Sequence, residues 1–215
     1  MSARTRIKIC GVSRREDVDA AVNAGADAIG FVFHAASPRH VSIAAATALA
    51  RGLPPFVTPV GLFVNAEADF IAAACAAIPN LILQFHGDED EPECLAPGRP
   101  FLKAARMAPG FDLLDFSRRF STAQALLLDA HVEGWGGSGK VFDWSLVPRA
   151  VPHHLVLSGG LHAANVAAGI RALRPWAVDV SSGVESSRGV KDAALIRAFC
   201  DAVREADSRI DASVS

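Results

Sequence analysis

Residues 6–11, Arg6-Ile7-Lys8-Ile9-Cys10-Gly11, decide the fold that this sequence predicts. The run Arg6–Cys10 has the length and apolar content of a strand, and Gly11 lets the backbone turn away at its carboxyl end. A helical pattern follows over residues 13–23, with Ser13 as the predicted cap, Glu16 three residues later and Gly25 after its end. This strand-then-helix unit recurs along the chain.

Seven further strand-length runs are separated by helical patterns or loops. The predicted strands cover residues 27–33, 58–64, 81–86, 101–105, 125–129, 155–158 and 177–180. The predicted helices cover residues 42–51, 66–77, 112–120, 142–147, 163–173 and 191–206, with a weak helix near Pro92 and a polar tail from about residue 207. Eight such units predict an α/β fold, a single-domain (βα)8 TIM barrel of eight parallel strands over residues 1–215, and an open doubly wound sheet is the alternative.

Composition limits the class of function. Lys and Arg number 21 and Asp and Glu 23, so the net charge is -2, and no basic block points to nucleic acid. The start lacks a secretory apolar region, and no later apolar run is long enough to span a membrane. The four cysteines, Cys10, Cys75, Cys94 and Cys200, lack metal-ligand spacing, so we expect no metal, no disulfide framework and a reducing cytoplasm. Small molecules are the expected partners, and the chain is either a monomer or a homodimer.

Two glycine-containing loops predict a phosphate site. Ser158-Gly159-Gly160-Leu161 follows the seventh predicted strand, and Ser181-Ser182-Gly183-Val184 follows the eighth. In barrels the loops after these two strands recurrently bind phosphate through unobstructed backbone N–H groups. Either loop alone would be an ordinary turn, but two at the expected positions favour phosphate binding by Gly159, Gly160, Ser182 and Gly183. The glycine-rich loop at residues 131–141 could close over the ligand, or be a flexible surface loop.

Ionisable side chains gather at the same predicted mouth. Because side chains alternate along a strand, Lys8 shares a face with Cys10, Gln84 with His86, and Leu127 with Asp129. If the last member of each pair points inward, Cys10, His86, Asp129 and also Asp179 meet there. The alternatives are a Cys10 packed in the core, a satisfied strand-end His86, and an Asp129 that caps a segment or pairs with Lys8 or Lys103.

Lys8 needs a carboxylate partner if it is buried. We expect that partner to be Asp179 or Asp27, which leaves Asp129 free to hold a proton. On the loop after the second strand, Arg39 follows Ser37 and Pro38, and its guanidinium could bind a carboxylate at two points. A solvated loop arginine is the alternative.

Several runs together resemble the motifs of the phosphoribosylanthranilate isomerase family of tryptophan biosynthesis. They are KICG at 8–11, GFVFHAASPRHVS at 30–42, VGLFVN at 60–65, LQFHGDED at 83–90, LLLDA at 126–130, GGSGKVFDW at 136–144, LSGGLHAANV at 157–166 and DVSSGVESSRGVKD at 179–192. The resemblance implies a cofactor-free Amadori rearrangement of N-(5-phosphoribosyl)anthranilate to 1-(2-carboxyphenylamino)-1-deoxyribulose 5-phosphate, so the expected substrate is a phosphorylated aminosugar.

The resemblance also implies roles for residues. Cys10 matches the family's general base, Asp129 its general acid, and Arg39 the residue that receives the anthranilate carboxylate. Gln84, His86, Asp179 and the two phosphate loops are the other expected binding residues. Two rival functions are an isomerase of the histidine pathway that uses the same chemistry, and a phosphosugar-binding barrel without activity. The cysteine at the end of the first strand favours the isomerase of the tryptophan pathway.

Overall fold

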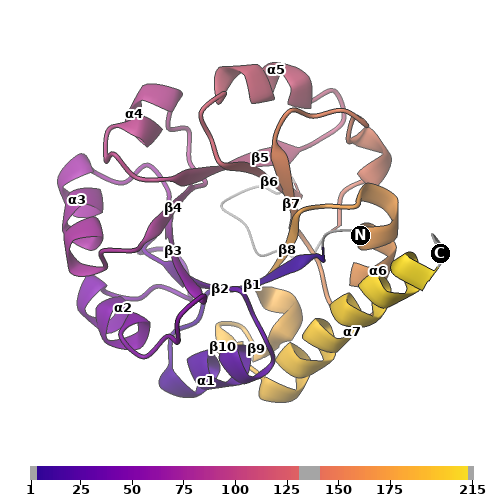
Figure 1. The fold of residues 1–215 in the computed structure, drawn as a ribbon. Coiled ribbons are helices and arrows are strands. Elements are labelled where there is room, and N and C mark those ends of the chain that lie inside the picture. The colour runs from indigo at the N-terminus through magenta and orange to yellow at the C-terminus, as the bar shows by residue number, and fades with distance from the viewer. Residues whose placement is uncertain (1–3, 131–140, 213–215) are drawn as a thin grey trace.

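The computed structural model describes residues 4–130 and 141–212, and its centre is a closed barrel. Eight parallel strands, β1 to β8, pair in sequence order, and β8 closes on β1. Figure 1 looks along the barrel from the end where the strands begin, with the helices forming an outer ring. The predicted (βα)8 barrel is confirmed, and the chain does not form an open doubly wound sheet.

The strands coincide closely with the predicted runs. Their bounds are Arg6–Cys10 (β1), Ala28–Val32 (β2), Thr58–Phe63 (β3), Ile82–Phe85 (β4), Phe101–Met107 (β5), Ala125–Ala130 (β6), His154–Leu157 (β7) and Ala177–Val180 (β8). The helices of the outer ring are Arg15–Asn23 (α1), Ile43–Ala50 (α2), Ala68–Ala77 (α3), Glu91–Leu95 (α4), Leu113–Arg119 (α5), Val166–Leu173 (α6) and Ala193–Ala212 (α7). Short 3-10 turns cover Trp144–Leu146 (η1) and Ser182–Val184 (η2).

Alternation along the strands divides the core into two parts. Outward side chains pack against the helices, and a row of phenylalanine rings runs there from Phe33 through Phe63 and Phe85 to Phe101, with neighbouring centroids 5.1 to 6.1 Å apart. Inward side chains are small or aliphatic around Leu127, and they leave room for polar groups higher in the barrel. The polar mouth therefore rests on an apolar floor.

Two local predictions are wrong. Ser13 does not cap the first helix, because the helix begins at Arg15 and the buried Asp17 carboxylate accepts the N–H of Arg14 at 3.2 Å. Residues 185–191 are not simply a loop leading into a helix from Lys191, because Glu185–Ser187 (β9) and Val190–Lys191 (β10) form an antiparallel hairpin. The contact of Asp17 with Arg14 and the backbone pairing of β9 with β10 both depend on interactions that residue propensities do not reveal.

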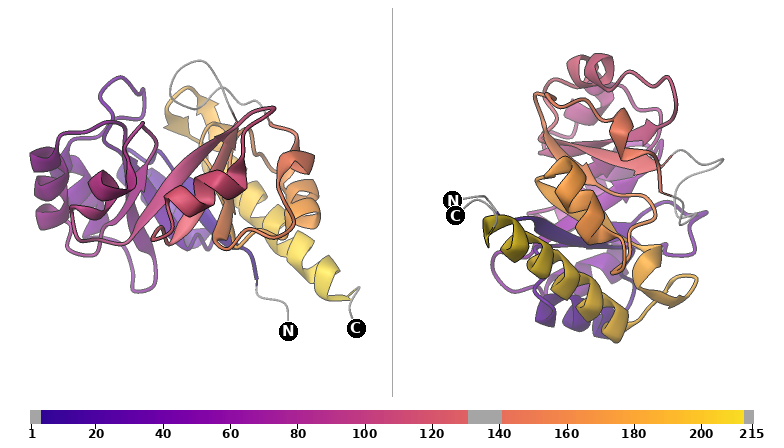
Figure 2. Two further views of the ribbon diagram at one scale, coloured as in Figure 1. Left: turned by 90° about the horizontal axis from the view of Figure 1, so that it is seen from above. Right: turned by 90° about the vertical axis from the view of Figure 1, so that its right-hand side faces the viewer.

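The last helix is longer than the sequence predicts. It continues to Ala212, into the polar tail predicted from about residue 207. Asp207 accepts hydrogen bonds from the N–H and the hydroxyl of Thr5, both at 2.7 Å, and Ile210 is buried. In the right-hand view of Figure 2 the yellow end of α7 lies beside the start of β1. Tertiary contacts therefore hold the turns that composition alone marks as polar.

The glycine-rich loop and the absence of a membrane span are two further predictions from the sequence. The glycine-rich loop at 131–141 falls almost entirely outside the described residues. Across residues 4–130 and 141–212, no helix has both the length and the apolar character needed to cross a membrane.

Candidate functional site

A pocket opens at the carboxyl ends of the strands. Its lining combines predicted site residues with apolar walls from Val32, Leu62 and Leu161. The predicted residues that line it are Cys10, Arg39, His86, Asp129, Gly159, Gly160, Asp179 and Ser182. Segments from both ends of the sequence therefore meet in one cavity, as the alternation of strand side chains predicts.

The ammonium of Lys8 binds Asp179 beneath this pocket. The two residues are cross-strand neighbours on β1 and β8, and Nζ lies 2.9 Å from Oδ1. Their side chains are only 6% and 5% exposed, so this is a buried ion pair. Burial lowers the pKa of Lys8, but the neighbouring Asp179 carboxylate and Cys10 side chain outweigh burial and hold that pKa above its usual value, so Lys8 stays a cation. The predicted pairing of Lys8 is confirmed.

Cys10 is the last residue of β1, and its thiol lies close to Lys8. A Cβ atom placed on Gly30 of the neighbouring strand would lie 2.8 Å from Sγ of Cys10 and 3.1 Å from Nζ of Lys8. A glycine at this position therefore leaves the space that the two groups fill. Burial raises the pKa of Cys10, and the opposing charge of Lys8 only partly offsets that effect. Burial therefore favours the neutral thiol over the thiolate.

Asp129 lies near the end of β6 and carries a carboxyl group that favours its proton. Burial, reinforced by the charge of Asp179, raises the pKa of Asp129 to about 6. A hydrogen bond of 2.9 Å from the N–H of Ala130 to Oδ1 acts in the opposite direction. Neither alternative partner of Asp129 forms an ion pair with it, because Lys8 binds Asp179 and Lys103 binds Glu89 at 2.8 Å.

His86 projects into the pocket as a neutral ring. Burial, with the charges of Lys8, Lys103 and Arg106, lowers the pKa of His86 to about 3. Its Nε2 lies 2.5 Å from the amide nitrogen of Gln84, and we assign the amide as donor, which leaves the proton of the ring on Nδ1. Gln84 itself is fully buried behind His86 and does not line the pocket. Any effect of Gln84 on a ligand is therefore exerted through His86.

The two predicted phosphate loops lie against one another. A Cβ atom on Gly183 would lie 1.9 Å from the carbonyl oxygen of Leu161, so only glycine allows this approach. Gly159 and Gly160 have φ angles of 77° and 66°, in the left-handed region. Their N–H groups donate no hydrogen bond to any part of the chain that the structure describes. The loops therefore offer backbone donors at one side of the pocket, as an anion requires.

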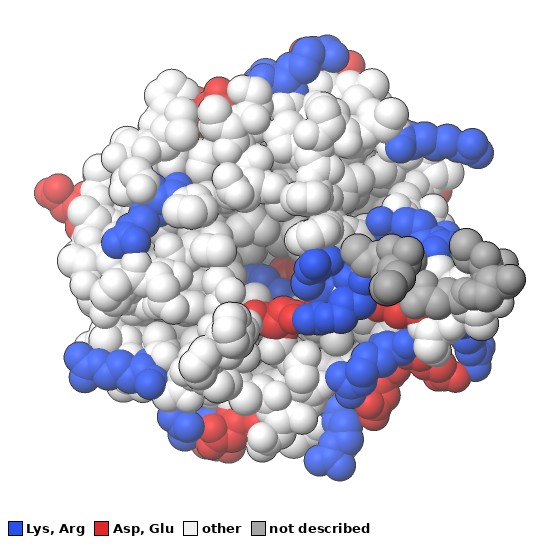
Figure 3. Space-filling view, in the orientation of Figure 1, with Lys and Arg blue, Asp and Glu red and all other residues white. Residues whose placement is uncertain are grey.

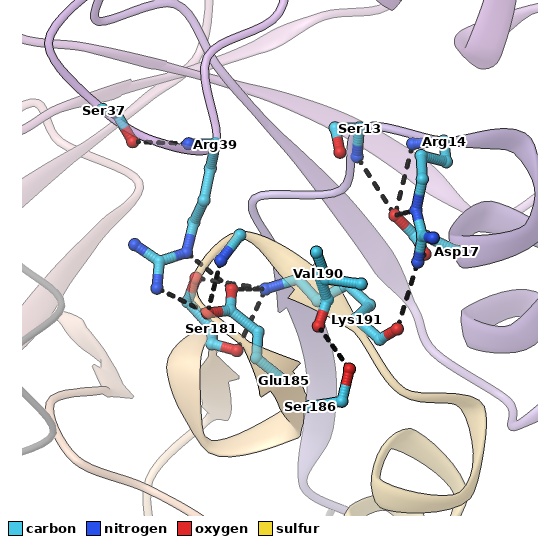
Figure 4. Close-up of polar contacts among 11 residues, drawn as sticks. Ser13, Arg14, Asp17, Ser37, Arg39, Ser181, Glu185, Ser186, Val190 and Lys191 are labelled. Atoms are coloured by element: carbon cyan, nitrogen blue, oxygen red, sulfur yellow. Dashed lines mark hydrogen bonds and ion pairs between the residues drawn. The ribbon is translucent and has the colours of Figure 1, made fainter.

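Arg39, on the loop after β2, forms an ion pair that the sequence did not predict. Its Nε and Nη2 donate to the two carboxylate oxygens of Glu185 at 2.6 and 2.8 Å, and Figure 4 shows this fork. Lys191 donates to Oε1 of Glu185 at 2.8 Å. Burial raises the pKa of Glu185, but hydrogen bonds from Arg39 and Lys191 outweigh burial and lower it to about 2.

Glu185 lies in a polar run that predicts a loop, and Lys191 is the first residue of the predicted last helix, so neither position indicates an ion pair with Arg39. The available signal was the turn at Arg188-Gly189, which separates two short stretches that can pair as a hairpin. No His, Cys, Asp or Glu cluster that could hold a metal occurs among the residues that the structure describes.

Comparisons with known proteins agree on one family. Residues 7–202 match the family model described as N-(5'phosphoribosyl)anthranilate (PRA) isomerase. A curated N-(5'-phosphoribosyl)anthranilate isomerase from Methylibium petroleiphilum is 71% identical over 210 residues, which are 98% of this chain and 99% of the relative.

Solved structures give the same result. One is a phosphoribosyl anthranilate isomerase in complex with reduced 1-(o-carboxyphenylamino)-1-deoxyribulose 5-phosphate, at 37% identity and a TM-score of 0.81, with 94% of this chain and 99% of that chain covered. Another presents monomers generated from the dimeric enzyme of Thermotoga maritima, at 36% identity and a TM-score of 0.80, with the same coverage.

Proposed function

Because the chain belongs to the N-(5'-phosphoribosyl)anthranilate isomerase family of tryptophan biosynthesis, we propose that it performs its Amadori rearrangement with Asp129 as general acid and Cys10 as general base. The substrate would be N-(5-phosphoribosyl)anthranilate and the product 1-(2-carboxyphenylamino)-1-deoxyribulose 5-phosphate. Family membership also separates this assignment from the histidine-pathway isomerase and from a phosphosugar-binding barrel without activity.

Asp129 would act first, on the oxygen of the ribose ring. Opening the ring to a Schiff base needs a proton on that oxygen, and a carboxyl group can supply it only if it is protonated near neutral pH. The pKa of Asp129, raised by burial to about 6, brings it much closer to that requirement than an exposed aspartate. A ligand that excludes water from the pocket would raise the pKa further.

Cys10 would then remove the proton from C2 of the Schiff base to form the enolamine. Burial raises the pKa of this thiol, so it needs assistance to become a base. Lys8 supplies a fixed positive charge beside it, and the iminium of the Schiff base supplies another as soon as the ring is open. The base is therefore favoured only after the acid has acted.

The remaining lining residues would hold the two ends of the substrate. The backbone donors of Gly159 and Gly160, with Ser182 and Gly183 in the adjoining loop, would bind the phosphate. Arg39 would receive the anthranilate carboxylate, with apolar contacts to the ring from Val32 and Leu62. Asp179 and His86 would contact the sugar between these ends.

The observation that carries the proposal is the meeting of a thiol and a carboxyl with a raised pKa in one pocket. Its test is turnover of phosphoribosylanthranilate by purified variants with an intact fold. Cys10→Ala and Asp129→Asn should each lower kcat at least about a hundredfold. A near-normal kcat in either variant rejects the role of that residue.

We also propose that the chain forms a homodimer through the end of the barrel where the strands begin. Phe56, between α2 and β3, is 100% exposed and has a left-handed φ of 71°, which is costly for an aromatic residue. At the same end a cavity enters the barrel, and Figure 3 shows the central hollow. Its apolar lining includes Ala28, Val60, Ile82, Leu102, Ala125 and Val156. In a two-fold symmetric dimer, Phe56 of each chain could enter the cavity of the other. The relative from Thermotoga maritima is dimeric.

We further propose a cytoplasmic location. Cys10, Cys75, Cys94 and Cys200 are all free and buried, as expected in a reducing compartment.

A further inference from the structure

The buried cluster of Arg39, Glu185 and Lys191 has no part in the proton transfers of the proposed reaction, yet its Arg39 lines the pocket. The three side chains are only 9%, 4% and 1% exposed. Burying three charges is costly unless each is paired and hydrogen-bonded. The cost of burying these charges beside a binding pocket indicates that the cluster has a role in function.

The geometry divides the guanidinium of Arg39 into two edges. Nε and Nη2 are used by Glu185, which holds the group in a fixed plane. Figure 4 shows Nη1 pointing away from Glu185, and within the described residues Nη1 has no hydrogen-bond partner. An arginine offers five N–H donors in a planar fork, so the Nη1 and Nη2 edge can still bind a second carboxylate at two points.

The charges of the cluster leave an excess that suits an anion. Glu185 neutralises one of its two cationic neighbours, so the cluster carries one net positive charge beside apolar lining residues. Lys191 also donates to the carbonyl of Ser181 at 3.0 Å, which ties the cluster to the loop after β8. The same residues thus connect the two ends of the proposed substrate site.

The surrounding backbone is shaped to keep Glu185 and Arg39 in place. The N–H of Gly189, at the turn of the β9–β10 hairpin, donates to Oε2 of Glu185 at 3.0 Å. Gly11 has a φ of 74°, and a Cβ atom there would lie 2.4 Å from Cδ of Arg39. The turn at Gly11 therefore leaves space for Arg39, and the hairpin supplies a backbone donor to Glu185.

We propose that Glu185, supported by Lys191, is a positioning residue that orients Arg39 for the aryl carboxylate of the substrate and so sets selectivity for anthranilate. The inference rests on the proposed function, because it assumes that Arg39 is the carboxylate receptor. A positioning role and a purely electrostatic role of Glu185 predict opposite changes in ligand affinity when its negative charge is removed. Loss of the negative charge of Glu185 alone would strengthen the attraction of the cluster for an anion. Loss of its positioning leaves two buried cations facing each other, displaces Arg39 and weakens binding.

The test compares two stable ligands in direct binding by calorimetry. One is reduced 1-(o-carboxyphenylamino)-1-deoxyribulose 5-phosphate, and the other is the same molecule without the carboxyl group. Glu185→Gln should weaken binding of the first ligand at least about tenfold and leave the Kd of the second within about twofold. Unchanged or tighter binding of the first ligand, or equal weakening of both, overturns the proposal.

Two further variants keep the result interpretable. If Glu185→Gln does not fold, the double variant Glu185→Gln/Lys191→Met removes the unpaired cation and should show the same selective loss. Lys191→Met alone keeps the two hydrogen bonds between Arg39 and Glu185. It should therefore weaken binding of the carboxylate ligand less than Glu185→Gln does. Wild-type protein that binds both ligands equally would show that the assignment of Arg39 fails. A wild-type preference that Arg39→Ala abolishes and Glu185→Gln keeps would overturn only the role of Glu185.

Discussion

Lys8 and Asp179 form a buried ion pair, 2.9 Å from Nζ to Oδ1, whose two ends act differently on the two proposed catalytic groups. At Cys10 the charge of Lys8 outweighs that of Asp179 and favours the thiolate, although burial keeps the pKa raised. At Asp129 the charge of Asp179 outweighs that of Lys8 and, after burial, favours the protonated acid. One pair thus favours a base on one strand and an acid on another.

Replacing Asp179 tests this division of charge. Asp179→Asn removes the carboxylate that raises the pKa of Asp129 and leaves Lys8 to lower it, so the pKa of Asp129 should fall below about 6. The variant also leaves a buried cation unpaired, which should cost about 3 to 5 kcal/mol of unfolding free energy. Titration of 13C-labelled aspartate by NMR, with Asp129→Asn to assign the signal, measures the pKa. A pKa that stays near 6 would contradict the effect.

Asp129 should make stability depend on pH. Its pKa is raised from 3.8 to about 6 in the folded state, so the folded chain binds the proton more tightly than the unfolded chain. Stability from this group is therefore present below pH 4 and is lost as pH rises to about 6, by about 3 kcal/mol. The unfolding free energy of Asp129→Asn should therefore rise relative to that of the wild type as the pH increases from 4 to about 6. Urea unfolding at pH 4 and pH 7 measures the difference, and an equal ΔΔG at both pH values would refute the shift.

Arg39→Ala should mainly weaken substrate binding. Removal of the guanidinium deletes the proposed carboxylate contact and leaves Cys10 and Asp129 in place, so KM should rise at least about tenfold while kcat changes less. The variant also strips Glu185 of one of its cations, so its fold must be checked by circular dichroism. An unchanged KM would exclude the carboxylate contact.

Phe56→Ser tests the proposed dimer. The substitution removes the exposed aromatic group, whose burial in a partner would contribute about 1.5 to 3 kcal/mol. Sedimentation velocity should show a dimer for the wild type and a shift to monomer for the variant. Leu95→Ser is the matched control, because Leu95 is 45% exposed on α4, and it should stay dimeric. A monomeric wild type, or a Phe56→Ser protein that remains a dimer, would reject this interface.

The sequence predicts the barrel well because the deciding signals are local. Each strand, from β1 at Arg6–Cys10 to β8 at Ala177–Val180, is a short apolar run, and eight of them allow few topologies. Strand alternation also places Cys10, His86 and Asp129 in one mouth, as the pocket bears out.

What the sequence did not predict depends on partners distant in the chain. Glu185 and Arg39 are 146 positions apart, and nothing near either residue indicates that they form a two-point ion pair. The final turns of α7 likewise depend on the contact between Asp207 and Thr5, which are 202 positions apart. Helical propensity and patterning contain no information on such contacts.

The most direct test of the acid and base roles is the isotope effect on kcat for substrate deuterated at C2 of the ribose. Cys10→Ala should be slow and show a primary isotope effect, because removal of the C2 proton limits its rate. Asp129→Asn should be slow with an isotope effect near one, because ring opening then limits the rate. Equal isotope effects in the two variants, or a near-normal kcat in either, would contradict the assignment of base and acid.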